Sequence, residues 1–279
     1  MKNEDETQTI KSFGDEWKKF DQDNLNKKYL EFDFNRYFKV FPWNLIDIKS
    51  EGYDMGCGTG RWAKFVSPKV KKLNCIEPSD AIQVAKKKLK DLDNIGFYKE
   101  KILSCSLKNN SQDFGYILGV LHHLPNPLIG LKKCVDLLKP GAPILIYFYY
   151  SFENRPFYFR IIWMISNFFR KLICRLPSFI KNLICEIISF LVYLPLVKFS
   201  KLTEILNLNF SNIPLYEYRN KPLYTLRTDA RDRFGTIIEH RMSKKEISSM
   251  MQKCNLTNIV FCDDAPYWCV SAIKIKNEE

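Results

Sequence analysis

Short apolar runs alternate with stretches of helical periodicity through the middle of the chain, between residues 51 and 150. Alternation of this kind is typical of βαβ units, which build a parallel sheet covered by helices on both faces. Two further apolar runs near the C-terminus predict a closing hairpin. We therefore expect an α/β fold, a Rossmann-like, mostly parallel sheet of seven strands. The expected strands are 52–55, 72–77, 95–100, 114–120, 143–150, 257–262 and 268–275, and the expected helices are 60–66, 79–91, 127–138 and, from a capping-box pattern at Ser243 and Glu246, 243–254.

The flanking segments differ from this pattern in composition. Residues 1–48 are charged and aromatic at loosely helical spacing, which predicts a helical flap. The flap either packs on the core or closes over a ligand as a lid. Residues 152–211 are strongly apolar and predict a helical insertion between the fifth strand and the C-terminal hairpin. The core is then expected to comprise residues 49–151 and 212–279.

The insertion combines apolar runs with positive charge. From 152 to 201 it has eight basic and two acidic residues, a net charge of +6. Arg160, Arg170, Glu186 and Pro195 interrupt its apolar runs before they reach the roughly 20 residues that a membrane span needs, so we expect no spanning helix. Two interpretations stay open: helices that lie in the plane of an anionic membrane surface, or a cap over an acceptor pocket.

Charge and cysteine usage narrow the class of protein further. The chain has 43 Lys and Arg against 31 Asp and Glu, a net charge of +12, which favours an anionic partner. Its nine cysteines are scattered and form no C-x-x-C pair, so we expect reduced thiols and no metal site. Residues 1–23 contain no apolar core of secretory length. We expect a cytoplasmic protein, held peripherally on the inner membrane face if the insertion docks there.

A glycine-rich segment, Asp54-Met55-Gly56-Cys57-Gly58-Thr59-Gly60, follows the first expected strand and opens a helix. Such glycines let the backbone approach a ligand at a helix N-terminus. A dinucleotide fingerprint would need its third glycine at position 61, which is Arg61, so NAD is disfavoured. Glu77 ends the next strand, 21 residues after Gly56, where a carboxylate can accept hydrogen bonds from ribose hydroxyls. The alternative is a packing turn with a solvent-facing acid.

The segment 54–60 resembles motif I of class I S-adenosylmethionine-dependent methyltransferases, and Ile76-Glu77-Pro78-Ser79 resembles their motif II. Residues 112–124 are similar to the family's fourth strand and the loop after it, and Leu138-Lys139-Pro140-Gly141-Ala142 to the turn before the fifth strand. The resemblance covers residues 50–150 and, more loosely, 220–275. It is closest to the type 11-like bacterial subgroup.

This resemblance implies S-adenosylmethionine as the cofactor. By analogy, Asp54 and the motif I glycines border the methionine portion, and Glu77 binds the ribose. Gly119 and Leu121 lie near the sulfonium. The family often has an acidic residue near the adenine after the third strand, where this chain has Ser104 as the expected substitute. The expected cofactor-binding residues are Asp54, Gly56, Gly58, Thr59, Gly60, Glu77, Ser104, Gly119 and Leu121.

Methyl transfer mainly requires an acceptor held in line with the methyl group, and an oxygen acceptor also needs a base. The chain has three histidines, His122, His123 and His240. His122 follows the fourth strand, at the edge where open α/β sheets bind ligands, so we expect it to act as the base and His123 to contact the substrate. The alternative for each is a structural histidine bonded to a loop carbonyl.

A polar segment between residues 227 and 241 lacks apolar periodicity and is interpreted as a loop. Its Arg227, Arg231 and His240 are candidates for gripping an anionic acceptor, since arginine binds anions with two parallel hydrogen bonds. A surface network of ion pairs is the alternative.

The function expected from these features is methyl transfer to a small or lipid-linked acceptor. A glycan hydroxyl is slightly preferred to an isoprenoid or quinone ring carbon. One alternative is an RNA methyltransferase, but nucleic acid is the less expected partner because the sequence shows no RNA-binding module. Another is a scaffold that binds the cofactor without turnover.

Overall fold

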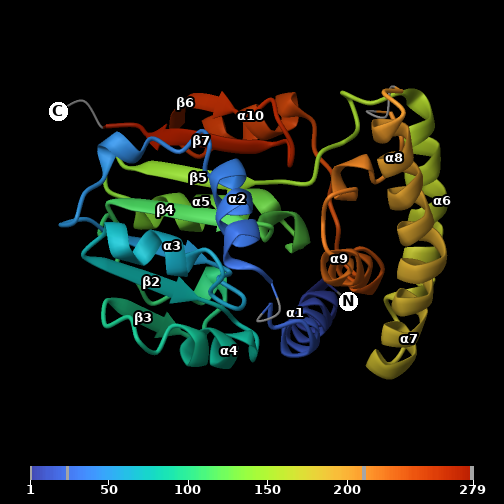
Figure 1. The fold of residues 1–279 in the computed structure, drawn as a ribbon. Coiled ribbons are helices and arrows are strands. Elements are labelled where there is room, and N and C mark those ends of the chain that lie inside the picture. Colours follow the sequence, from blue (N-terminus) through green and yellow to red (C-terminus); the bar gives the residue numbers. More distant parts are fainter. Residues whose placement is uncertain (1, 23–24, 209–211, 277–279) are drawn as a thin grey trace. The chain divides into compact units, whose positions relative to one another are not determined.

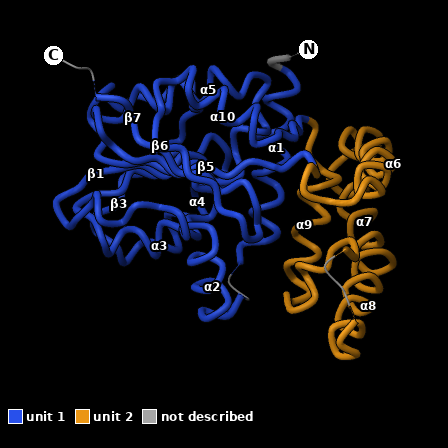
Figure 2. Tube along the Cα trace, turned by 90° about the horizontal axis from the view of Figure 1, so that it is seen from above, with its two compact units in different colours: residues 1–151, 238–279 blue, residues 152–237 orange. Residues whose placement is uncertain are grey.

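The computed structural model describes residues 2–22, 25–208 and 212–276 (Figure 1). The chain divides into two compact units, coloured separately in Figure 2. The core unit comprises residues 1–151 and 238–279, and the insertion unit comprises Phe152–Ile237.

The core unit contains one sheet of seven strands in the order β3-β2-β1-β4-β5-β7-β6. Strands β1 to β5 are parallel, whereas β7 pairs antiparallel with both β5 and β6. The expected Rossmann-like sheet with a reversed C-terminal hairpin is therefore confirmed. The strands are β1 Glu51–Met55, β2 Lys72–Ile76, β3 Ile95–Tyr98, β4 Phe114–Leu118, β5 Pro143–Tyr147, β6 Leu256–Phe261 and β7 Cys269–Lys274.

Helices cover both faces of this sheet (Figure 1). On one face α5 and α10 pack over Ile117, Ile144 and Ile146. On the other, α2, α3 and α4 pack over Leu73 and Tyr116. The helices of the core unit are α1 Lys2–Lys19, α2 Lys27–Tyr37, α3 Ala63–Val66, α4 Ala81–Lys88, α5 Pro127–Leu137 and α10 Lys244–Lys253.

The capping box predicted for α10 is present. The Ser243 hydroxyl accepts a hydrogen bond from the Glu246 amide at 3.2 Å, and the Glu246 carboxylate accepts one from the Ser243 amide at 2.8 Å. These two bonds satisfy amides that a helix N-terminus otherwise leaves without partners.

The flap expected at residues 1–48 is helical and belongs to the core unit. Phe34 and Phe38 of α2 are buried with Trp62 in the cluster on one face of the sheet. The aromatic residues of α2 therefore stabilise the fold. Helix α1 packs against α4 instead.

The insertion unit contains α6 Phe157–Ile173, α7 Ser178–Ile188, a π-helical turn Ser189–Tyr193, α8 Leu194–Ile205 and α9 Leu223–Gly235. The elements α7, π turn and α8 form one continuous helix, Ser178–Ile205. Glu186 and Pro195 were both expected to interrupt this run before it reached the length of a membrane span, and that expectation is wrong. Proline lies in the first turn of α8, just after the π turn, where local hydrogen bonding is already altered.

By length and composition this 28-residue helix could cross a membrane. Core helices of water-soluble proteins can be equally long and apolar, so burial is needed to distinguish the two kinds of helix. Only 22% of its most apolar window is buried, however, which distinguishes it from a core helix.

The segment interpreted as a loop, residues 227–241, is helical as far as Gly235. Helix α9 packs along α7, which is why the compact unit extends to Ile237 and not only to residue 211. Polar pairs join the two helices. Because apolar periodicity is weak in α9, its helical character was not visible in the sequence.

Candidate active site

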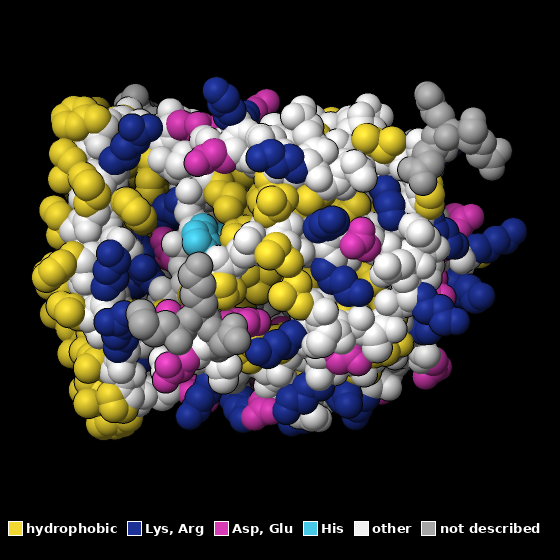
Figure 3. Space-filling model, turned by 180° about the vertical axis from the view of Figure 1, so that it is seen from behind, with side chains coloured by type: hydrophobic (Ala, Val, Ile, Leu, Met, Phe, Trp, Pro, Cys, Tyr) yellow, Lys and Arg dark blue, Asp and Glu magenta, His cyan; other side chains and the backbone are white. Residues whose placement is uncertain are grey.

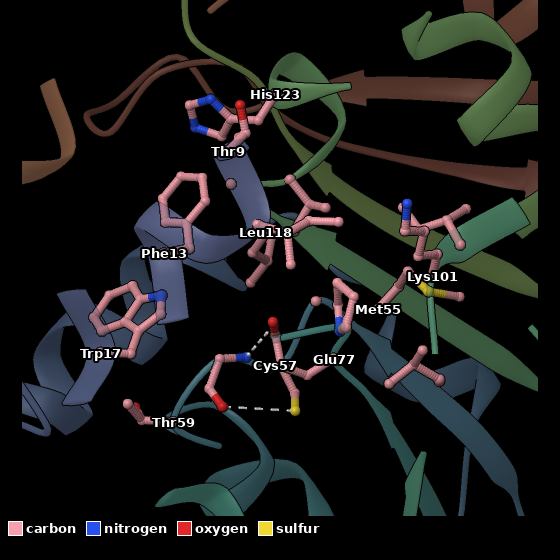
Figure 4. Close-up of a pocket in the computed structure, with 18 of the residues that line it drawn as sticks. Thr9, Phe13, Trp17, Met55, Cys57, Thr59, Glu77, Lys101, Leu118 and His123 are labelled. Atoms are coloured by element: carbon pink, nitrogen blue, oxygen red, sulfur yellow. Dashed lines mark hydrogen bonds between the residues drawn. The ribbon is translucent and has the colours of Figure 1, made fainter. Parts of the chain in front are cut away.

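A cavity of about 980 Å³, partly open to solvent, lies in the core unit where β1, β2 and β4 end. Its wall comes from α1, the glycine-rich segment after β1, the motif after β2, residues 100–102 and the loop after β4. Among the predicted site residues, those that line it are Gly56, Gly58, Thr59, Glu77, Gly119 and His123 (Figure 4).

The backbone of the glycine-rich segment is held by β2. The Gly56 and Cys57 amides both donate to the Ile76 carbonyl, at 2.7 and 3.1 Å. Gly56 has φ +76°, and an added Cβ would lie 2.3 Å from Val120 Cγ2. Glycine is therefore required here by both backbone conformation and space.

A second glycine on the cavity wall, Gly119, lies directly after β4. Its φ is +81°, but an added Cβ would meet no atom within 4 Å. A side chain at this position would therefore extend into the open space of the cavity. This arrangement allows a ligand to approach the backbone closely.

Among the described residues, three carboxylates line the cavity, Glu6, Glu77 and Glu100, and of these Glu77 is buried. It is 7% exposed, and its two oxygens accept hydrogen bonds from the Gly58 and Ser79 amides at 3.1 and 2.9 Å (Figure 4 shows the first). Burial raises the pKa of this carboxyl, and the hydrogen bonds oppose that shift. Each oxygen retains a lone pair, so Glu77 can also accept hydrogen bonds from hydroxyl groups of a ligand.

Asp54, at the end of β1, lies behind the cavity wall. It is 2% exposed, and burial raises its pKa to about 8. Within the described part of the chain its Oδ2 atom has no hydrogen-bond partner. Burial thus favours the protonated form of Asp54, which is not among the lining residues.

Three other expected cofactor residues do not line the cavity either: Gly60, Ser104 and Leu121. Leu121 is fully buried in the core. Ser104 is exposed, and its hydroxyl donates to the Lys101 carbonyl at 3.4 Å. Glu100, Lys101 and Ile102 line the cavity in its place, so the acidic residue expected after the third strand is supplied by Glu100.

The two adjacent histidines differ in position. His122 is fully buried, and its ring stacks on that of Tyr149 with centroids 3.9 Å apart. Burial lowers the pKa of His122 well below its usual range, so its ring is neutral. His123 lines the cavity, and its Nδ1 lies 2.7 Å from the Ile238 carbonyl oxygen. Because a carbonyl only accepts, Nδ1 carries a proton, and in the neutral ring Nε2 is the acceptor.

The remaining candidates for acceptor binding have structural partners. His240 Nε2 lies 3.0 Å from the Leu124 carbonyl oxygen. Arg227 makes a two-point ion pair with Glu186 at 2.7 and 2.8 Å. Arg231 is 1% exposed within the insertion unit and donates to Asn182 at 2.8 Å. The contacts of Arg227 and Arg231 join α9 to α7.

Helix α1, part of the segment interpreted as a packed flap or a lid, supplies a wall of the cavity, although none of its residues was named as a site residue from the sequence. Phe13 and Trp17 point toward the glycine-rich segment and His123 from successive turns of α1 (Figure 4). Gln22, just after the helix, lies 3.1 Å from the Thr59 hydroxyl through its Oε1 atom. The i, i+4 spacing of Phe13 and Trp17 was the available signal, but the same spacing is equally typical of packing.

The residues present fit S-adenosylmethionine. Gly119 leaves open space at the backbone, and Glu77 presents acceptor oxygens for ribose hydroxyls. The indole of Trp17 and the ring of Phe13 add aromatic surface. Aromatic faces attract cations such as a sulfonium, and their apolar area suits an adenine ring.

Comparison with known proteins agrees with this geometry. Residues 53–146 match the family described as "Methyltransferase domain". A demethylmenaquinone methyltransferase of Staphylococcus aureus is 23% identical over 134 residues, which cover 44% of this chain and 56% of that relative. The chain therefore spans about half the length of the curated relatives it matches.

Solved structures share the fold. A protein from Bacillus halodurans C-125 superposes with a TM-score of 0.54 at 10% identity, over 88% of this chain and 100% of that one. The S-adenosylmethionine-dependent methyltransferase SibL gives 0.51 at 11% identity, over 89% of this chain and 56% of that one. Residues 53–146 thus match a methyltransferase domain, and the chain shares the fold of class I S-adenosylmethionine-dependent enzymes.

Proposed function

We propose that this protein transfers a methyl group from S-adenosylmethionine to a small or lipid-linked acceptor. The observation that carries the proposal is the position of Glu77, a buried carboxylate held by two amides beside the glycine-rich segment. In this arrangement Glu77 binds the ribose hydroxyls, and the backbone at Gly56 and Gly58 borders the methionine portion. The matched methyltransferase domain includes all of these residues.

Transfer from a sulfonium needs alignment more than it needs a catalytic group, because positive charge on sulfur disappears as the methyl group leaves. Gly119 opens the backbone of the loop after β4, and the Phe13 side chain lies in the same cavity (Figure 4). These residues shape the space in which an acceptor meets the methyl group. Helix α1 limits the access of water to that space.

The acceptors we propose are a glycan hydroxyl and an isoprenoid or quinone ring. The second is supported by the relative named demethylmenaquinone methyltransferase. Apolar and aromatic side chains such as Leu118, Val120 and Trp17 on the cavity wall also favour an acceptor with an apolar ring. An acceptor of either kind attached to a lipid would place the protein peripherally on the cytoplasmic face of a membrane.

We further propose His123 as the base for an oxygen acceptor, in place of His122. His123 lines the cavity, and its Nδ1 contact with the Ile238 carbonyl defines Nε2 as the atom that takes the proton. His122 is fully buried behind it and is suited to support the ring of Tyr149. Arg227, Arg231 and His240 hold structural contacts and are not part of this proposal.

The first experiment is calorimetric titration of S-adenosylmethionine and of NAD against the wild-type protein, Glu77→Ala and Glu51→Ala. Glu51 is the matched control because it begins β1, at the opposite end of the strand from the cavity. We expect binding of the methyl donor, loss of at least about tenfold in affinity for Glu77→Ala, and no change for Glu51→Ala. Binding of NAD alone, or no binding, would contradict the proposal.

The second experiment tests turnover. Formation of S-adenosylhomocysteine is measured with demethylmenaquinone, a lipid-linked glycan and bulk tRNA as acceptors. Product with either of the first two supports the proposal, product with tRNA alone supports an RNA methyltransferase, and binding without product from any acceptor supports a scaffold. For an oxygen acceptor, His123→Gln should lower kcat by about 100-fold or more and flatten its pH profile, whereas His240→Gln should not.

A further inference from the structure

The insertion unit exposes most of its large hydrophobic side chains. Of the 28 large hydrophobic side chains exposed in the described structure, 21 lie in Phe152–Ile237. In Figure 3 they gather as a continuous yellow surface over the helices of this unit. We call the exposed hydrophobic residues of α6 and Ser178–Ile205 the outer apolar face. On α6 they include Phe157, Ile161, Ile165, Phe168 and Leu172, which recur at three- and four-residue spacing along one side.

The long helix continues this face without an outward charge over its first twenty residues. Lys181 and Glu186 are the charged residues between Ser178 and Val197, and both are engaged inward. Lys181 is 6% exposed and donates to the Gly235 carbonyl at 3.3 Å, and Glu186 is held by Arg227. Twenty helical residues extend about 30 Å, the thickness of the hydrocarbon core of a bilayer.

The interior of the same unit contains polar side chains beside an apolar cluster of Ile173, Cys185 and Phe234. Arg170 is 5% exposed, and its Nη1 donates to the Thr236 and Ile237 carbonyls at 2.6 and 2.8 Å. Polar side chains that could have faced water are thus buried, while large apolar side chains are exposed over the outside. An exposed apolar surface of this extent is typical of a surface that contacts a membrane or another protein.

Exposed basic residues accompany the outer apolar face. Arg160 and Lys171 lie on α6, Arg175 follows it, and Lys198 lies on α8. Their long side chains can extend from an apolar surface to lipid phosphates. A second copy of this chain on the same face would bring like charges together, which disfavours self-association. The charge pattern favours anionic lipid instead.

We propose that the insertion unit is embedded by its outer apolar face in one leaflet of an anionic bilayer, with α6 and the long helix in the plane of the membrane. A crossing orientation is disfavoured because α9 packs along α7 with Asp229, Asp232 and Arg233, which would then enter hydrocarbon. Apolar burial provides the main binding energy, and the basic residues select the lipid. This inference stands on the insertion unit alone and holds whatever the acceptor is.

The test is flotation with vesicles of phosphatidylcholine and phosphatidylglycerol at low and high salt. The variant combines Leu183→Gln, Ile187→Gln and Leu191→Gln, three exposed positions on one side of the long helix whose replacements preserve helix propensity. We expect the wild-type protein to float and to remain partly bound at high salt, because apolar burial is not screened. The triple variant should lose at least about tenfold in partitioning, since three buried aliphatic side chains contribute well over 1.4 kcal/mol.

The matched control combines Leu45→Gln, Leu103→Gln and Ile129→Gln, which are similarly exposed in the core unit. It should float like the wild-type protein. Absence of flotation by the wild-type protein, or equal flotation by both triple variants, would overturn the proposal. So would a stable dimer in ultracentrifugation that the long-helix variant abolishes, because the face would then be a self-interface. Calorimetry with S-adenosylmethionine on the same samples reports the proposed function independently.

Discussion

The core unit and the insertion unit use buried polar residues in opposite ways. In the core unit three buried titratable groups, Asp54, Glu77 and His123, lie at or directly behind one cavity. In the insertion unit buried Arg170 and Arg231 are distributed along the helix contacts and bond to neighbours within the unit. These three groups of the core thus belong to a site, whereas the two buried arginines of the insertion join helices.

The two units also differ in how much apolar surface they expose. The core unit exposes few large hydrophobic side chains, as expected for a surface in water, and the insertion unit exposes most of those in the described structure. Large exposed apolar patches mark interaction surfaces. The two units thus differ both in what they bury and in what they expose. Four predictions test this difference, beginning with the largest expected effect.

Gly56→Ala should abolish measurable binding of S-adenosylmethionine while leaving the insertion unit unaffected. The added Cβ would lie 2.3 Å from Val120 Cγ2, at a backbone φ of +76°. We expect a loss of about 100-fold or more by calorimetry, since strain and displacement of the loop both act on the site. Gly141→Ala is the control for φ alone, because Gly141 has φ +83°, lies outside the cavity, and its added Cβ would meet only the flexible side chain of Lys276. An equal effect of both variants would show that crowding at Gly56 is not the cause.

Arg170→Met should destabilise the insertion unit through the carbonyl groups of Thr236 and Ile237, which lose their donor. We expect a cost of about 1–3 kcal/mol in urea unfolding followed by circular dichroism. Arg160→Met, on the exposed side of the same helix, should change stability by less than about 0.5 kcal/mol. If the two variants behave alike, the buried arginine is not what joins α6 to the end of α9.

Affinity for S-adenosylmethionine should fall as the pH is lowered. Burial raises the pKa of Glu77, so its carboxylate form, which accepts the ribose hydroxyls, is lost at a higher pH than for an ordinary glutamate. Titrations at several pH values should show this decline in the wild-type protein. Glu77→Gln should bind about tenfold more weakly at neutral pH and show little dependence on pH. A parallel decline in both would assign the titration to another group.

Asp54 should make the stability of the core unit depend on pH in a specific direction. Its folded pKa of about 8 exceeds that of an unfolded aspartate, so its favourable contribution is fully present below about pH 4 and is lost as pH rises through 8. The melting temperature of the wild-type protein relative to Asp54→Asn should therefore decrease from acidic to alkaline pH. A difference that stays constant with pH would mean that Asp54 is not protonated in the folded protein.

Local sequence patterns predicted the core well. Its signals depend on neighbours within a few residues of one another. They are the alternation of strands and helices, the capping box at Ser243 and the glycine spacing at 56, 58 and 60. The strands were predicted to within a few residues of their observed bounds. Gly56 and Glu77 could be placed in one site because parallel strands bring their carboxyl ends to one edge.

Other features depended on contacts between distant residues. The helical character of α9 follows from its packing along α7, with Arg227 paired to Glu186, 41 positions away. The wall formed by α1, and the difference between buried His122 and cavity-lining His123, also arise only when segments pack together.

The sequence by itself determined the class of fold, the position of the glycine-rich segment and the net positive charge of the insertion, because spacing and composition are local or additive properties. Tertiary structure alone decided which of two adjacent histidines lines the cavity and which charges of the insertion point inward. It also decided that the long helix runs through Pro195 with an uninterrupted apolar face. The physical reason is that burial depends on what covers a side chain, and the covering residues lie far away in the sequence.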